Sequence, residues 1–124
     1  MERALAIREE ALGLDHPHTT SSLHLLALIL RASGDSPAAS PLLERVVSVR
    51  ERMLGQTHHE TAWALHDLAA MYRDQADPAA ARPLFERALA IRERVLGPDH
   101  PDTVATRTAL AELAGEGDGP ATGG

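Results

Sequence analysis

Apolar residues recur along this chain at the i, i+3, i+4, i+7 spacing that places them on one stripe of a helix. Two such stripes lie 42 residues apart. They are formed by Leu23, Leu26, Ala27 and Leu30 and by Leu65, Leu68, Ala69 and Tyr72. No segment alternates apolar and polar residues as a half-buried strand would. The pattern therefore predicts a chain built of helices alone.

The same period of 42 residues governs the segments between the helices. Each copy ends in a Leu-Gly pair, followed after three residues by a His and after three more by a Thr. These positions are Leu12-Gly13, His16 and Thr19, then Leu54-Gly55, His58 and Thr61, then Leu96-Gly97, His100 and Thr103. A fixed period of this length indicates one supersecondary unit stacked on itself.

Turn and capping residues divide each unit into two helices. Gly34 favours a left-handed helix C-terminus, and Pro78 favours the first turn of the next helix. Where the first helices open, an Asp or His precedes a Pro and can cap the helix. We expect second helices over about 37–54 and 78–96, and first helices opening at 15–17 and 99–101. The predicted fold class is an all-α solenoid of antiparallel helix pairs, with five helices.

The units resemble the tetratricopeptide repeat. The resemblance rests on Leu-x-x-Leu-Ala-x-x-Tyr at 65–72, Gly-Asp at 34–35, and Ala-x-x-x-Phe-x-x-Ala-Leu at 81–89. The period and the Leu-Gly-x-Asp-His-Pro-x-Thr linker are similar to the long variant of the repeat in kinesin light chains and many bacterial regulatory proteins. The resemblance covers residues 2 to about 114. It implies a right-handed superhelix whose concave groove binds a peptide or protein segment.

The repeat divides the chain into a helical domain and a tail. The helical domain is expected over 1–114. Its parts are a half repeat 1–13, repeats 14–55 and 56–97, and a terminal helix 98–114. Residues 115–124 are rich in Gly and have little to bury, so we expect a disordered tail there.

The resemblance implies that the first helix of each pair lines the groove. The candidate groove residues share one stripe of these helices. They are Ser21, His24, Leu28 and Arg31, then Trp63, His66, Ala70 and Arg73, and Thr108 beside Ala105 and Glu112 on the last helix. Arginine can hold a carboxylate with two bonds, and tryptophan can anchor an apolar side chain. The stripe would therefore suit an acidic or carboxylate-ended peptide.

Structural interpretations compete with this one. Trp63 can fill space between neighbouring helices, and Arg31 and Arg73 near helix C-termini can offset the helix dipole without a ligand. Family members often carry Asn where this chain has His24 and His66, so ligand specificity does not carry over. These two histidines, one repeat apart at about 10 Å, are too distant to bind one metal ion. The linker histidines recur with the repeat, which favours a turn role, and we expect no metal and no cofactor.

Charge and composition exclude several function classes. The 12 basic residues are all Arg and stand against 18 acids, which leaves a net charge of −6 and argues against nucleic-acid binding. The chain has no Cys, which excludes thiol catalysis and thiolate metal sites. The longest apolar run, 25–30, is far shorter than the roughly 20 residues of a membrane span. We expect a cytoplasmic protein whose other arginines and repeating glutamates lie on the surface.

The sequence favours partner binding over catalysis. No Gly-rich phosphate loop, Gly-x-Ser-x-Gly or His-Glu-x-x-His motif is present, so we predict no enzyme. The leading hypothesis is a protein–protein interaction scaffold that holds a peptide or protein segment in its groove. One alternative is a self-associating segment, dimerising through an N-terminal helix whose Leu5, Ile7 and Leu12 lack a partner. Another is a fragment of a larger bacterial signalling regulator that contains these repeats.

Overall fold

A computed structural model of the chain describes residues 17–122, with side chains described from residue 19 to residue 115. The half repeat 1–13, and the N-terminal helix through which a dimer is predicted, lie outside the described residues. Every candidate groove residue lies inside them.

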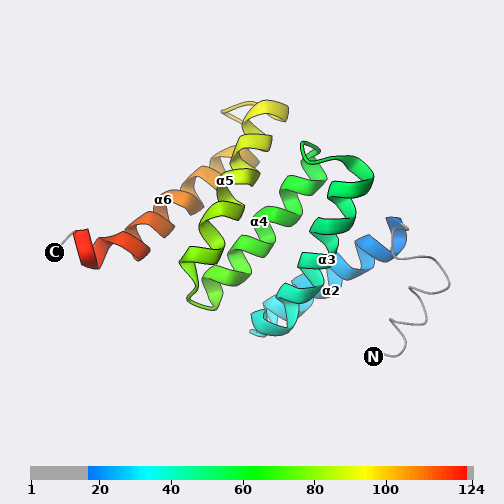
Figure 1. The fold of residues 1–124 in the computed structure, drawn as a ribbon, viewed down its shortest axis with the longest axis horizontal. Helices are drawn as coiled ribbons and strands as arrows, with labels where there is room; N and C mark the ends of the chain where they lie inside the picture. Colours follow the sequence, from blue (N-terminus) through cyan, green and yellow to red (C-terminus); the bar gives the residue numbers. More distant parts are fainter. Residues whose placement is uncertain (1–16, 123–124) are drawn as a thin grey trace.

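The described residues form five helices and no strand, which confirms the all-α prediction. The helices are α2 (Pro17–Ala32), α3 (Ser36–Leu54), α4 (His59–Asp74), α5 (Pro78–Val95) and α6 (Pro101–Thr122). Each helix packs against the next one along the chain, and the row runs from α2 to α6 (Figure 1). This sequential packing is what a stacked repeat produces, because each unit contacts only its neighbours.

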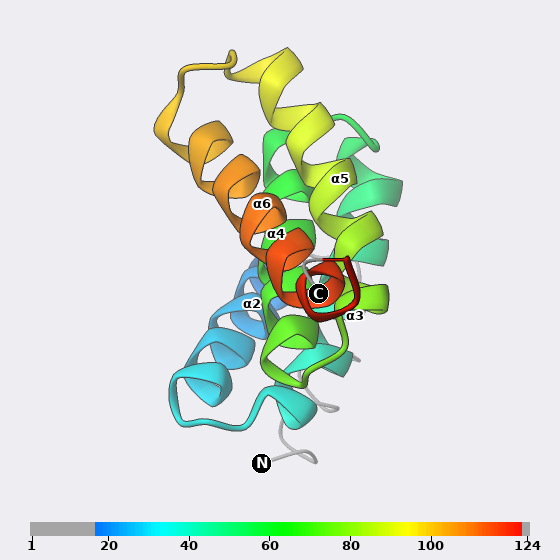
Figure 2. The same ribbon diagram turned by 90° about the vertical axis from the view of Figure 1, so that its left-hand side faces the viewer.

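The helices form two layers. Seen from the side, α2, α4 and α6 lie on one side of the molecule and α3 and α5 on the other (Figure 2). The layers arise because each pair is joined by a short turn, which folds its second helix back against its first. The candidate groove residues all come from the layer of α2, α4 and α6.

Short polar side chains start the second helix of each pair. The Asp35 carboxylate accepts from the backbone N–H of Ala38 at 3.3 Å, and Asp77 accepts from Ala80 at 3.2 Å. Each cap satisfies one of the backbone N–H groups that a helix start leaves without an intrahelical partner. The starts at Ser36 and Pro78 therefore agree with the sequence to within one residue.

Two of the linker histidines cap the helices that follow them, α4 and α6. Nδ1 of His58 accepts from the backbone N–H of Glu60 at 3.0 Å, and Nδ1 of His100 accepts from that of Asp102 at 3.1 Å. This is the local turn role that the repeat predicts for them.

The apolar stripes meet in two core clusters between the layers. The first joins α2, α3, α4 and α5 around Leu23, Leu43 and Leu65. The second joins α4, α5 and α6 around Phe85 and Leu113. All five side chains are fully buried. Each Å² of apolar area that is removed from water stabilises the fold by about 25 cal/mol.

The last helix corrects one predicted boundary. The sequence places the end of the terminal helix at residue 114 and a disordered tail from 115, but α6 continues to Thr122. Leu113, just before this extension, is fully buried in the second cluster. Gly115 has helical backbone, which costs only about 1 kcal/mol relative to Ala and does not by itself stop a helix.

Candidate functional site

Most candidate groove residues reach the surface of the α2, α4 and α6 layer. Ser21 and Thr108 are exposed, Leu28, Arg31, His66 and Arg73 are half-buried, and Trp63 is 43% exposed. A tryptophan that is partly exposed in this way is the type of side chain that anchors partners at interfaces.

The structure corrects two of the predicted positions. His24 is only 1% exposed and Ala70 only 3%, so neither can touch a partner. The helical phase places both on the stripe of Trp63 and Arg73, but α4 packs over α2 at His24, and Ala70 belongs to the cluster around Phe85. Packing between helix pairs therefore covers positions that the geometry of one helix leaves open.

A buried polar network explains why a histidine sits at position 24. Nη1 of Arg50 donates to Nδ1 of His24 at 2.7 Å, and Nε2 of His24 lies 2.8 Å from Oδ2 of Asp67. Because arginine can only donate, Nδ1 is the acceptor, and Nε2 carries the proton that it donates to the carboxylate. The ring is thus a neutral imidazole that links three helices, α3, α2 and α4.

Trp63 lies directly over this network. Its ring centroid is 4.1 Å from that of His24, at an interplanar angle of 41°, and Cζ of Arg50 lies 5.5 Å from the Trp63 ring centroid. Contacts of this kind are worth roughly 0.5–1.5 kcal/mol each. Trp63 therefore packs between neighbouring helix pairs, as the structural interpretation holds, and still exposes one side of its indole.

The two groove arginines already have carboxylate partners. Nε of Arg31 donates to Oδ2 of Asp74 at 2.7 Å, and Nη1 of Arg73 lies 3.8 Å from Glu112. Burial by itself would raise the pKa of Asp74, but hydrogen bonds from Arg31 and Ser36 and the charges of both arginines outweigh it, so this pKa is lowered. Both arginines also lie in the last turn of their helices, where they offset the dipole.

His66 makes different contacts from His24. Its ring meets that of Phe85 edge-on at 5.2 Å, and its Nδ1 lies 3.0 Å from Oγ1 of Thr106. Nη1 of Arg92 donates to the same oxygen at 2.9 Å. Burial, reinforced by the charges of Arg92, Arg73 and Arg31 and opposed by Asp67, lowers the pKa of His66 from 6.5 to about 4.

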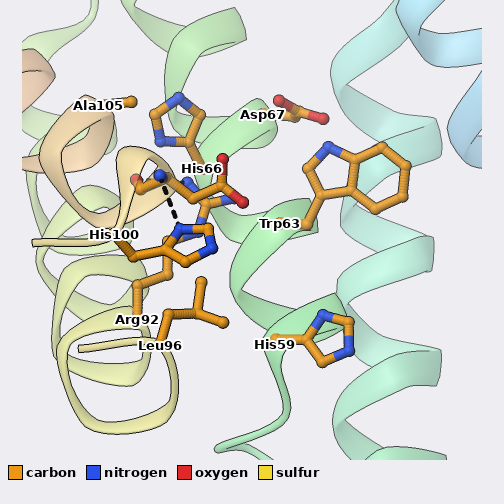
Figure 3. Close-up of a pocket in the computed structure, with 9 residues that line it drawn as sticks. His59, Trp63, His66, Asp67, Arg92, Leu96, His100 and Ala105 are labelled. Atoms are coloured by element: carbon orange, nitrogen blue, oxygen red, sulfur yellow. Dashed lines mark hydrogen bonds between the residues drawn. The ribbon is translucent and has the colours of Figure 1, made fainter.

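A cavity of about 400 Å³ opens beside His66, between α4, α5 and α6. Three histidines, His59, His66 and His100, lie around it, with Trp63 at its edge (Figure 3). The remaining lining residues are Asp67, Arg92, Leu96, Asp102 and Ala105. The lining of the cavity is about half polar and half apolar, and its volume is that of a ligand-sized pocket.

Sequence reasoning missed the arginines of this region. Arg50 and Arg92 are both buried, although the sequence analysis assigns the repeating arginines outside the groove to the surface. Burial lowers the pKa of both, while nearby carboxylates act in the opposite direction: Glu60 and Asp67 on Arg50, and Asp102 and Asp67 on Arg92. Their shared 42-residue spacing was the available signal, since a charge that recurs with the repeat can also be a buried link between units.

One group in the described part of the chain has metal-ligand character. Nitrogen atoms of His58 and His59 and a carboxylate oxygen of Glu60 lie within 4.8 Å of one another. Nδ1 of His58 already accepts the Glu60 N–H, and the group stands at a helix N-terminus, which disfavours a cation.

Comparison with known proteins identifies the fold. Two models described as Tetratricopeptide repeat match residues 1–52 and 61–102. The chain belongs to the tetratricopeptide repeat family, as its motifs predict. Repeats of this family are generally protein–protein interaction modules. A search of curated proteins finds no match.

Two solved structures are similar to this chain. A Podospora anserina protein described as a kinesin light chain of nearly identical TPR-like repeats matches with a TM-score of 0.82 at 31% identity, covering 91% of this chain and 54% of that one. BtubC (BKLC) from P. vanneervenii matches with a TM-score of 0.82 at 25% identity, covering 94% and 47%. The chain therefore spans about half the length of these structures.

No helix in the described residues is both long enough and apolar enough to cross a membrane.

Proposed function

We propose that this chain is a non-catalytic binding scaffold, with no metal or cofactor, that holds a peptide or protein segment on the surface of its α2, α4 and α6 layer. The observation that carries the proposal is Trp63. Its ring centroid lies 4.1 Å from that of His24 and 5.5 Å from Cζ of Arg50, while 43% of the side chain stays exposed. A rigid, half-exposed aromatic ring costs little conformational entropy on binding and is therefore a good anchor for a partner.

The charges of the layer favour an acidic partner. Arg31 and Arg73 pair with Asp74 and Glu112, and all four side chains are between about a quarter and two thirds exposed. Ion pairs this exposed are worth roughly 0–1 kcal/mol. A partner carboxylate that brings its own apolar contacts can therefore replace either acid at little cost. The kinesin light chain names of the similar structures agree with a role in protein binding.

Charge reversal on the layer tests this function. Peptides selected on the wild-type chain from a random displayed library should contain acidic residues. Arg31→Glu with Arg73→Glu should weaken their binding at least tenfold, measured by fluorescence anisotropy. Arg94→Glu with Arg87→Glu, the same charge change on α5 in the other layer, should leave it within twofold. Unchanged binding by the folded Arg31/Arg73 variant would remove the groove assignment.

Self-association is the second candidate function, and two exposed side chains favour it. Leu25 and Ile29 on α2 are 60% and 53% exposed, whereas the residues one repeat later, Asp67 and Met71, are buried where α4 docks on the preceding helix pair. We infer that this face of α2 docks another helix pair, from a second copy or from a longer repeat array.

Sedimentation velocity tests whether a second copy of the chain docks on this face of α2. The wild type should sediment as a dimer at high concentration, and Leu25→Lys with Ile29→Lys should make it a monomer. Val104→Lys, an exposed apolar position on α6, is the control and should leave the dimer intact. A wild-type chain that remains monomeric at the highest concentration excludes the dimer.

A further inference from the structure

The molecule contains two junctions of the same design. At the first, α4 docks on the pair α2 and α3, and at the second, α6 docks on the pair α4 and α5. Shifting the first junction by 42 residues gives the second one. His24 becomes His66, Arg50 becomes Arg92, Glu60 becomes Asp102 and Trp63 becomes Ala105. The histidine, the buried arginine and the acid at position 60 or 102 are thus kept, whereas the tryptophan is lost and Asp67, which bonds His24, becomes Ala109.

The cavity lies where the second junction has Ala105 in place of the tryptophan. At the first junction the Trp63 indole covers His24 and lies under Arg50. At the second junction Ala105 offers only a methyl group, and the cavity of about 400 Å³ is lined by Ala105 together with His66 and Arg92. The open space therefore adjoins the same histidine and the same arginine that hold an indole one repeat earlier.

We propose that this cavity binds a planar aromatic ring that carries an N–H donor and is neutral or cationic. The ring would contact His66 and Arg92 as the Trp63 indole contacts His24 and Arg50. It can belong to a free small molecule or to a side chain of a partner. The assignment goes beyond the scaffold function, since it holds for a small molecule with no peptide bound.

The polar lining sets the preference for an N–H donor. Asp67, whose Oδ2 accepts from Nε2 of His24, and the exposed Asp102 both line the cavity. Carboxylates accept hydrogen bonds and do not donate them, so a ring N–H is the complementary group.

The same lining sets the preferred charge. Two carboxylates, Asp67 and Asp102, stand against one guanidinium, Arg92. Arg92 is already committed to Oγ1 of Thr106 and the carbonyl oxygen of Asp102, at 2.9 Å and 3.1 Å. Among the lining residues, carboxylates therefore outnumber guanidinium groups that are free to bind, which favours an amine over a carboxylate, while Arg73 and Arg31 act on His66 from outside the lining. His66, whose pKa is lowered to about 4, is neutral at pH 7 and does not repel a cation.

Binding of indole, followed by ¹⁵N–¹H NMR on the full chain, tests the assignment. Indole should shift the amide resonances of residues around the cavity, such as His66 and Ala105, and leave those around Leu43 unchanged. Tryptamine should bind at least as tightly as indole, and both 1-methylindole and indole-3-acetate should bind at least threefold more weakly. Shifts scattered over the molecule, or equal affinity for all four probes, would overturn the proposal.

Filling the cavity provides the matched variant. Ala105→Trp places at the second junction the residue that the first one carries, and should reduce indole affinity at least tenfold. If this variant does not fold, Asp102→Asn decides, because Asp102 is exposed and its backbone contacts are kept. Asp102→Asn should reduce the preference for tryptamine over indole-3-acetate at least threefold. A folded variant of either kind that binds like the wild type contradicts the proposal.

A capped tryptophan amide separates the two sources of the ring. Affinity within threefold of indole means that the cavity accepts a side chain attached to a peptide. Affinity more than tenfold weaker means that it accepts a free small molecule only.

Discussion

At the scale of single residues, a buried network of charged and polar side chains joins neighbouring helix pairs. Arg50, His24 and Asp67 satisfy one another across three helices, with contacts of 2.7 Å and 2.8 Å. Removing His24, the central member, would leave Asp67 without this partner and Arg50 with Glu60 alone, and a buried charge that loses a partner is costly. The network therefore fixes how α4 sits on the preceding helix pair.

The second histidine gives a pH dependence. Burial lowers the pKa of His66 to about 4 in the folded chain, below the usual value of 6.5, so the unfolded chain binds the extra proton between these pH values. Stability should therefore fall as the pH drops from about 6.5 to 4, by roughly 2–3 kcal/mol from this group. Urea unfolding at several pH values measures the effect.

Substitution of His66 shows how much of this pH dependence of stability comes from its ring. His66→Gln should be less stable at pH 7 but should show a flatter profile between pH 6.5 and 4. A profile as steep as that of the wild type would assign the effect to other groups.

A second residue-scale prediction concerns a turn. Ala76 has φ +61°, a left-handed conformation that costs an L side chain about 1 kcal/mol, whereas the repeat carries Gly34 with φ +86° at the same place. Ala76→Gly should raise the free energy of unfolding by about 0.5–1 kcal/mol in urea denaturation. Ala90→Gly, at an exposed helical position of α5, should lower it by about 1 kcal/mol.

At the scale of elements, the start of α4 departs from its counterparts. The position after the capping histidine carries Pro17 and Pro101 in the other linkers but His59 here. Pro fits this first helical position because its fixed φ suits the helix and its missing N–H is not needed. His59→Pro should therefore stabilise the chain by about 0.4–1 kcal/mol in thermal or urea unfolding.

The neighbouring residue supplies the contrast. His58→Ala removes the acceptor of the Glu60 N–H and should cost about 0.5–2 kcal/mol. Equal effects of the His58 and His59 substitutions would mean that capping does not set the start of α4.

At the scale of the whole molecule, the two core clusters allow local opening. Phe85 and Leu113 belong to the cluster that joins α4, α5 and α6, whereas Leu23 and Leu43 belong to the other. Phe85→Ala should cost about 3–5 kcal/mol. Because units contact only their neighbours, hydrogen exchange should speed up most in α5 and α6 and least in α2. Uniform loss of protection along the chain would instead show that the helices unfold together.

The sequence by itself determined the helices, their order and their family. Apolar spacing and capping residues are local, so the 42-residue period places the helix starts at residues 17, 59 and 101 as observed. Trp63, Arg31 and Arg73 lie on the surface, where the pattern of one helix face places them, and their role in binding stays a prediction. These features depend on neighbours along the chain or on one helix face.

Only the tertiary structure decided what lies between the helix pairs. The periodicity of one helix cannot show that α4 covers His24, that Arg50 and Arg92 are buried, or that Arg31 already holds Asp74. The sequence shows that Ala105 stands one repeat after Trp63. Only the structure shows that a cavity lies beside Ala105. Burial and pairing depend on residues some 40 positions apart, and packing alone brings these together.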